Sequence, residues 1–115
     1  MTTITDEYMH QMRSTTRSYS FVILKATPRR AEPGADRIVW EHGRRNFALR
    51  ADGLLVIVCP MTDDGEVRGV SIFNASVEET KRIMDEDPAV KAGVLTFEVH
   101  AGLSFPGDSL PAKDG

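Results

Sequence analysis

The chain of 115 residues contains a single cysteine, Cys59. One thiol cannot form an internal disulfide, which excludes a small secreted scaffold held by cross-links and favours a reducing compartment. No apolar run approaches the ~20 residues that cross a bilayer, and the first twenty residues lack the apolar core of a signal peptide. We therefore predict a cytoplasmic protein that does not bind a membrane.

Short motifs that bind nucleotides, metals or nucleic acids are also missing. Neither G-x-x-x-x-G-K-[ST] nor G-x-G-x-x-G occurs, and these are the glycine patterns whose backbone amides cradle phosphates. The three histidines and the cysteine lack the spacing of a zinc site. Aromatic residues make up only 7% of the chain, and the arginines are not interleaved with them as in single-strand binders. We expect no cofactor, no metal and no nucleic-acid partner.

The charges that are present are distributed unevenly. Residues 1–50 hold nine basic and five acidic residues, whereas residues 51–115 hold five basic and twelve acidic ones. The net charge is only −3, and the content of 41% hydrophobic and 27% charged residues is typical of one compact domain. We expect the basic and acidic halves of a single fold to attract each other.

Hydrophobic patterns predict four strands and two long helices. The apolar run 54–59 is typical of a strand covered on both faces, and Asp64-Gly65 is a strong hairpin signal after it. Ser76 and Glu79 form a capping box before a helix that ends at Pro88. The strands are expected at residues 18–26, 54–59, 67–75 and 94–100, and the helices at residues 35–51 and 77–87. The order βαββαβ predicts an α+β, ferredoxin-like fold, an antiparallel sheet with both helices on one face.

Two terminal segments flank this domain, which is expected to span residues 18–103. In the N-terminal extension, residues 1–17, helical spacing of apolar residues indicates a short helix near residues 5–13. The C-terminal arm, residues 104–115, is rich in proline and glycine. One sheet face carries no helix, so a second copy is expected to cover it. We predict a homodimer and leave further assembly open.

Two polar side chains interrupt the apolar stripe of the first long helix. His42 and Asn46 share one face with Ile38 and Leu49, because residues three and four apart lie on the same side of a helix. A single histidine there is more often a core residue with satisfied hydrogen bonds. Two polar groups one turn apart favour a polar-lined cavity instead. Both interpretations stay open at this point.

Three successive acids, Asp85, Glu86 and Asp87, stand at the predicted end of the second helix. The helix dipole disfavours negative charge at that position. Either the three carboxylates are solvated, or one of them turns inward and holds the tautomer of a histidine.

Two polar residues of the third predicted strand are further candidates. Arg68 follows the hairpin and is either a surface residue or a group that meets an anionic ligand. Ser71 lacks the context of a nucleophile elbow. It is therefore considered only as a hydrogen-bond donor.

Three stretches resemble a known family. They are residues 40–60 with Trp40-Glu41-His42, Asp52-Gly53 and Cys59-Pro60, residues 69–79, and the sequence D-P-A-V-K-A-G-V at 87–94. Together they are similar to the YciI-like, or YCII-related, domain over about residues 18–103. The main marks are the helix histidine, the glycine eleven residues later and the D-P-x-V-x-A-G stretch. The resemblance implies a ferredoxin-like protein that forms a dimeric α/β barrel, with His42 and Asp87 paired in a cleft.

Two positions near the expected cleft depart from the family pattern. Cys59 precedes Pro60 where members commonly have glycine, and Asn46 stands where they commonly have leucine. The substrate is therefore expected to differ from that of the better-known members.

The leading hypothesis is a cofactor-independent enzyme that acts on a small organic molecule as a lyase or isomerase. A dehydrochlorinase-like elimination is the model that the resemblance offers. His42 is the expected general base and Asp87 orients it, while Asn46 or Ser71 donates a hydrogen bond to the developing oxyanion and Arg68 binds substrate. The alternative is a non-catalytic dimeric module that binds a small molecule or a partner protein. A cofactor-free monooxygenase shares the fold but needs an oxygen-reactive substrate, which nothing in the sequence selects.

Overall fold

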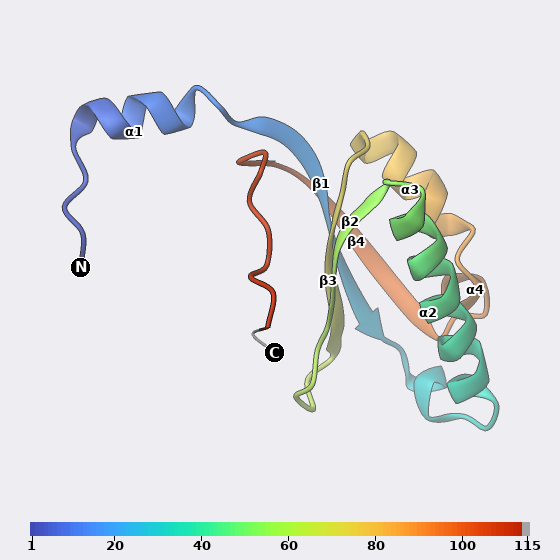
Figure 1. Cartoon of the computed structure of the whole chain (residues 1–115). Helices are drawn as coiled ribbons and strands as arrows, with labels where there is room; N and C mark the ends of the chain where they lie inside the picture. The colour runs from blue at the N-terminus through green and yellow to red at the C-terminus, as the bar shows by residue number, and fades with distance from the viewer. Residues whose placement is uncertain (114–115) are drawn as a thin grey trace.

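The four apolar segments of the sequence form one antiparallel sheet, and helices pack on one of its faces (Figure 1). This computed structural model describes residues 1–113. The elements are α1 (Asp6–Arg13), β1 (Arg17–Ala26), the 3-10 helix η1 (Pro28–Ala31), α2 (Ala35–Ala51), β2 (Leu55–Pro60), β3 (Val67–Phe73), α3 (Val77–Asp85), α4 (Pro88–Lys91) and β4 (Leu95–Ser104). The predicted α+β architecture is confirmed.

The strands lie in the order β2-β3-β1-β4, with every neighbouring pair antiparallel. This order is compatible with the predicted ferredoxin-like fold, because the βαβ connections leave β1 in the interior of the sheet. The bounds of α2 agree with the predicted helix at residues 35–51. The hairpin predicted between the second and third strands joins β2 to β3.

The fourth strand is longer than predicted. Its ladder with β1 continues past residue 100 until Ser104 lies opposite Arg17. Ala101 and Gly102 are weak strand formers, which is why the pattern indicated an earlier end. In the fold, a Cβ atom on Gly102 would lie only 2.6 Å from Cε2 of the Phe21 ring. The glycine therefore allows a close approach of the neighbouring strand's aromatic side chain.

The second long helix, predicted as continuous to residue 87, is divided in the structure. Helix α3 ends at Asp85, and a separate turn, α4, begins at Pro88. Proline disfavours the helical conformation in the residue before it, and Asp87 accordingly has φ −67° and ψ 133°. The prediction was wrong about this end of the helix because Asp87 starts a new helix instead of finishing the old one.

The core lies between the sheet and the helices. It contains strand residues such as Val22, Leu55 and Phe73, together with helix residues such as Met84 and Ala89, all 2% exposed or less. The other sheet face has apolar side chains that remain half-exposed, among them Phe21, Ile23, Val70 and Ile72, which are paired across β1 and β3. This uncovered face is the one on which a second copy was predicted to pack.

The N-terminal helix projects away from the rest of the molecule (Figure 1). The predicted short helix is present as α1, but none of its residues is buried. The radius of gyration is 16.6 Å, against about 13 Å for a compact chain of this length. Residues 105–113 of the predicted C-terminal arm form no helix or strand, and its last two residues lie outside the described part of the chain.

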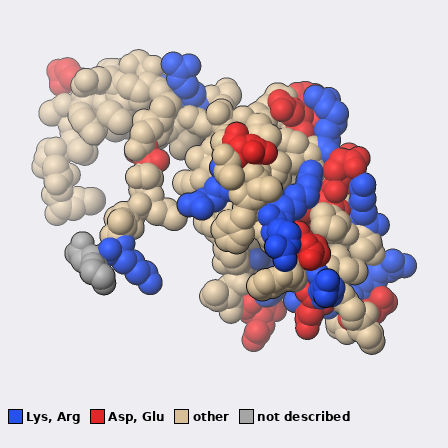
Figure 2. Space-filling view, turned by 45° about the vertical axis from the view of Figure 1, so that its right-hand side comes forward, with Lys and Arg blue, Asp and Glu red and all other residues tan. Residues whose placement is uncertain are grey.

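Charged side chains of both signs are intermixed over the helical part of the molecule (Figure 2). Lys25 of the basic half pairs with Glu66 and Glu98 of the acidic half, at 3.7 and 3.0 Å. Other pairs, such as Arg30 with Asp36, join residues of the same half. The predicted attraction between halves is therefore present alongside local pairs. No helix within residues 1–113 has the length and apolar character needed to cross a membrane.

Two glycine substitutions test the backbone of this fold. Gly93 follows α4 with a φ of 73° and donates its N–H to the carbonyl of Val90. Gly93→Ala should lower the free energy of unfolding by about 1 kcal/mol, because side chains disfavour that conformation. Gly43→Ala, inside α2 with no atom near the added methyl, should raise it by about 0.5–1 kcal/mol. Urea denaturation measures both, and changes of the same sign would contradict the described backbone.

Candidate functional site

Asp87 is the buried member of the three acids at the junction of α3 and α4. It is fully buried, whereas Asp85 is exposed and Glu86 pairs with Lys91 at the surface, at 2.7 Å. The sequence placed all three acids at a helix end, where negative charge is disfavoured. Asp87 is instead the N-cap of α4, a position that favours aspartate because free N–H groups point toward it.

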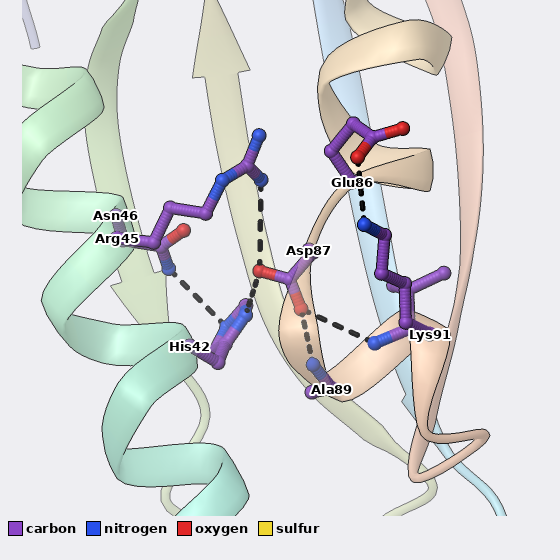
Figure 3. Close-up of polar contacts among 8 residues, drawn as sticks. His42, Arg45, Asn46, Glu86, Asp87, Ala89 and Lys91 are labelled. Carbon is purple, nitrogen blue, oxygen red and sulfur yellow. Dashed lines mark hydrogen bonds and ion pairs between the residues drawn. The ribbon is translucent and has the colours of Figure 1, made fainter.

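The two oxygens of the Asp87 carboxylate have different partners (Figure 3). Oδ2 accepts hydrogen bonds from the backbone N–H groups of Ala89 and Val90, at 2.9 and 3.2 Å. Oδ1 lies 2.7 Å from Nδ1 of His42, which reaches it from α2. The capping interaction therefore holds the carboxylate in place while its second oxygen is available to the histidine.

His42 forms the centre of this hydrogen-bonded chain. The residue is 8% exposed. An ionised carboxylate can only accept hydrogen bonds, so Nδ1 must carry the hydrogen that it donates to Asp87. In the neutral ring Nε2 then has a free lone pair. Nδ2 of Asn46, one helical turn further along α2, lies 3.2 Å from Nε2 and donates to it. The predicted pair His42 and Asp87 is thus in direct contact, with Asn46 as its third member.

Opposing effects act on the pKa of Asp87. Burial raises the pKa because it penalises the charged form, while the hydrogen bond from His42 and the electrostatic attraction of its ring lower it. The N–H groups of Val90 and Ala89 lower it further, and together these effects outweigh burial and hold the pKa below its ordinary value. The carboxylate is therefore ionised at neutral pH, as the tautomer of His42 requires.

Arg45 is a neighbour that the sequence analysis missed. Its Nη1 lies 3.9 Å from Oδ1 of Asp87, and this nitrogen is buried without a hydrogen-bond partner within the described residues. A guanidinium beside the carboxylate adds positive charge on the side of the pair that faces α3 and α4 (Figure 3). Its position three residues after His42 places both on one helix face, which is the signal that would have identified it.

A cavity of about 280 Å³ lies beside the histidine. His42, Asn46, Ser71 and Arg68, the four predicted residues other than Asp87, all line it. Asp87 does not, and contacts His42 from the side away from the cavity. The walls are mainly apolar and include Leu24, Val39, Val58 and Leu95. The structure therefore brings the predicted residues together around one space, with the carboxylate behind the histidine.

Further residues of the cavity were anticipated only in part. Cys59, expected near the cleft, lines it at the end of β2, whereas Pro60, Arg30 and Phe47 were not expected there. Ser71 is buried on β3 with its side chain on the helix-bearing face. Within residues 1–113, no three His, Cys, Asp or Glu side chains are grouped as metal ligands would be.

This arrangement is suited to moving a proton inside a small apolar space. Nδ1 of His42 is held by Asp87, so Nε2 on the opposite ring edge is the nitrogen that meets the cavity. A carboxylate behind the ring also stabilises the imidazolium that forms when Nε2 takes a proton. Comparison of the chain with models of known protein families gave no match, and comparison with curated proteins gave none either.

The hydrogen bonds of Asp87 predict a pH-dependent contribution to stability. Asp87→Asn should lower the free energy of unfolding by about 1.5–3 kcal/mol at pH 7, the contribution typical of hydrogen bonds to a charged group. As the pH falls, Asp87 is protonated in the unfolded chain before it is protonated in the folded one, because folding lowers its pKa. The difference in the free energy of unfolding between wild type and Asp87→Asn should thus have its full size above about pH 5. It should shrink as the pH falls through the pKa of Asp87 in the folded state.

Urea denaturation between pH 7 and pH 3 measures this effect. Asp85→Asn is the matched control, because it removes the same charge from an exposed side chain two residues away. Identical pH profiles for the two variants would show that Asp87 contributes no special hydrogen bonding.

Proposed function

We propose that the protein is a cofactor-independent enzyme that moves a proton on a small organic molecule, as a lyase or an isomerase. The observation that carries the proposal is the buried pair of His42 and Asp87, joined at 2.7 Å beside a cavity. In this role Nε2 of His42 is the general base, and Asp87 is a positioning residue that fixes the tautomer. The site lies in a single-cysteine chain, which is compatible with action in the cytoplasm.

In the reaction, Nε2 removes a proton from a carbon next to a carbonyl group. The electron pair of the broken C–H bond becomes the carbon–carbon double bond of an enolate as the carbonyl π electrons move onto oxygen, and His42 becomes an imidazolium whose charge Asp87 stabilises. In a lyase, the electrons then return to form a carbon–carbon double bond as an anion such as chloride leaves the adjacent carbon. In an isomerase, the imidazolium returns the proton to another carbon.

The hydrogen-bond donors of the cavity have a defined part in this scheme. Asn46 donates to Nε2 in the resting site, so its amide must turn away before the base can accept a proton. Once turned, Nδ2 can donate to the oxygen on which negative charge develops, as can the hydroxyl of Ser71. Donors that act on charge present only in the transition state increase the rate of the chemical step.

We also propose that the chain belongs to the YciI-like family, for which the dehydrochlorinase-like elimination is a model. The resemblance of residues 40–60 and 87–94 is supported by the strand order and by the contact between His42 and Asp87. The departures at Asn46 and Cys59 both lie at the cavity wall. They support a substrate different from that of other members.

The uncovered sheet face supports the dimeric form of this fold. Phe21, Ile23, Val70 and Ile72 form an apolar surface on β1 and β3, and apolar surfaces of this kind are covered in stable proteins. We propose that a second copy packs on it, sheet against sheet, to form a dimeric α/β barrel.

Proton exchange in D2O tests the catalytic proposal with general carbon acids in place of the natural substrate. The protein is incubated with simple ketones and unsaturated lactones, and loss of C–H signals is followed by NMR. His42→Ala should slow exchange about 10²–10⁴-fold, and Asp87→Asn should slow it because the tautomer is no longer held. His10→Ala, an exposed histidine on α1, should leave the rate unchanged.

A full exchange rate in His42→Ala would overturn the assignment of the base. Saturable binding of a carbon acid with no exchange in wild type would instead support the non-catalytic binding module.

The dimer is tested by light scattering at micromolar protein concentration. Wild type should have twice the mass of the chain, and Ile72→Asp should be monomeric because it places a charge in the apolar face. Lys81→Asp, at an exposed position of α3, is the control and should remain dimeric. A wild-type protein that is monomeric at this concentration would contradict the proposed dimer.

A further inference from the structure

We propose that the cavity selects substrates that carry a carboxylate, and that Arg68 binds this group. The inference rests on the proposed function, which makes this cavity the substrate site. It concerns recognition, and it does not depend on which bond the enzyme breaks.

The charge of the cavity is the first observation. Its lining includes two arginines, Arg30 and Arg68, and none of the described residues that line it is an aspartate or glutamate. The chain as a whole has more acidic than basic residues. A cavity lined by arginines and by no carboxylate therefore differs in charge from the protein as a whole. An anion entering an apolar space needs a partner of opposite charge, because burial of an unpaired charge is costly.

The pairing of the two arginines is the second observation. Nη1 of Arg30 already binds the carboxylate of Asp36 at 2.7 Å. Arg68 has no ion pair with a carboxylate of residues 1–113. Its Nη1 donates to the backbone carbonyls of Asp63 and Gly65, at 3.0 and 3.2 Å. The two carbonyls fix the guanidinium but do not neutralise its charge.

The strand geometry gives Arg68 its direction. In the ladder between β1 and β3, Leu24 pairs with Gly69 and Lys25 with Val67, so Arg68 is the extra residue of a β-bulge. A bulge re-aims a side chain that regular alternation would place elsewhere. Arg68 lines the cavity, as does Gly69 beside it.

The remaining donors of Arg68 match a planar carboxylate. With Nη1 used by the hairpin, Nε and Nη2 form a second pair of N–H groups, and a guanidinium edge of this kind binds both oxygens of a carboxylate. The volume of about 280 Å³ lies just below the usual range for ligand pockets, which favours a small molecule. The substrate class is thus a small molecule with an apolar body, one carboxylate and an acidic C–H bond.

Binding of benzoate tests the inference, with benzamide as its neutral analogue of the same shape. By calorimetric titration, wild type should bind benzoate at least tenfold more tightly than benzamide. Arg68→Gln should weaken benzoate binding at least tenfold and leave benzamide binding unchanged. Arg37→Gln removes the same charge from an exposed position outside the cavity, and it should bind benzoate as wild type does.

Several outcomes would overturn the inference. They are equal affinity of wild type for benzoate and benzamide, unchanged benzoate binding in Arg68→Gln, or tighter binding of phenyl phosphate than of benzoate. The comparison of benzoate with benzamide on wild type is informative even where Arg68→Gln loosens the hairpin. Arg68→Lys keeps the charge but not the paired donors, so it should bind benzoate more weakly than wild type and more tightly than Arg68→Gln.

The test is separable from that of the proposed function. His42→Ala should still prefer benzoate to benzamide, because the charge of Arg68 remains. Selective binding of benzoate without proton exchange on any carbon acid would retain the recognition by Arg68 and remove the catalytic role of His42. Proton exchange that is confined to neutral carbon acids and unchanged in Arg68→Gln would retain the catalytic role of His42 and remove the recognition by Arg68.

Discussion

The carboxylate of Asp87 is the group on which both the site and the adjoining fold depend. A buried charge is stable only when its oxygens are paired, and here the backbone of α4 satisfies one oxygen while His42 satisfies the other. The same atoms therefore start a helix and set the tautomer of a histidine. Because α4 is a single turn and α2 a long helix, the pair also fixes how these two elements face each other.

Much of the fold could be predicted because it follows from local patterns. The bounds of α2 follow from turn-forming residues before Ala35 and from Asp52-Gly53 after it. The strand order follows from the alternation of elements along the chain. Helical periodicity also placed His42 and Asn46 on one face. These features depend on residues close in sequence, and for that reason sequence analysis found them.

The features that sequence analysis missed depend on contacts between distant segments. Pro88 was read as the end of one helix, whereas Asp87 starts another because its carboxylate caps α4 and meets His42 across the fold. The extension of β4 to Ser104 needs β1 as its partner. Arg45 has no motif of its own and matters only because Asp87 lies 3.9 Å away. The resemblance to the YciI-like domain named Asp87 among three acids, a choice that local reasoning left open.

The bulge in β3 has a consequence for the length of the hairpin that precedes it. Side chains of a strand alternate with a period of two, so one added or lost residue reverses the face of every later side chain. In β3 the extra residue, Arg68, offsets a change of this kind, so that Ser71 and Phe73 keep their side chains on the buried face. Insertions at the exposed tip, residues 62–65, lengthen only a loop. A single deletion at residue 68 restores regular alternation and removes Arg68 from the cavity wall, so tolerance to changes in chain length should differ sharply between positions only three residues apart.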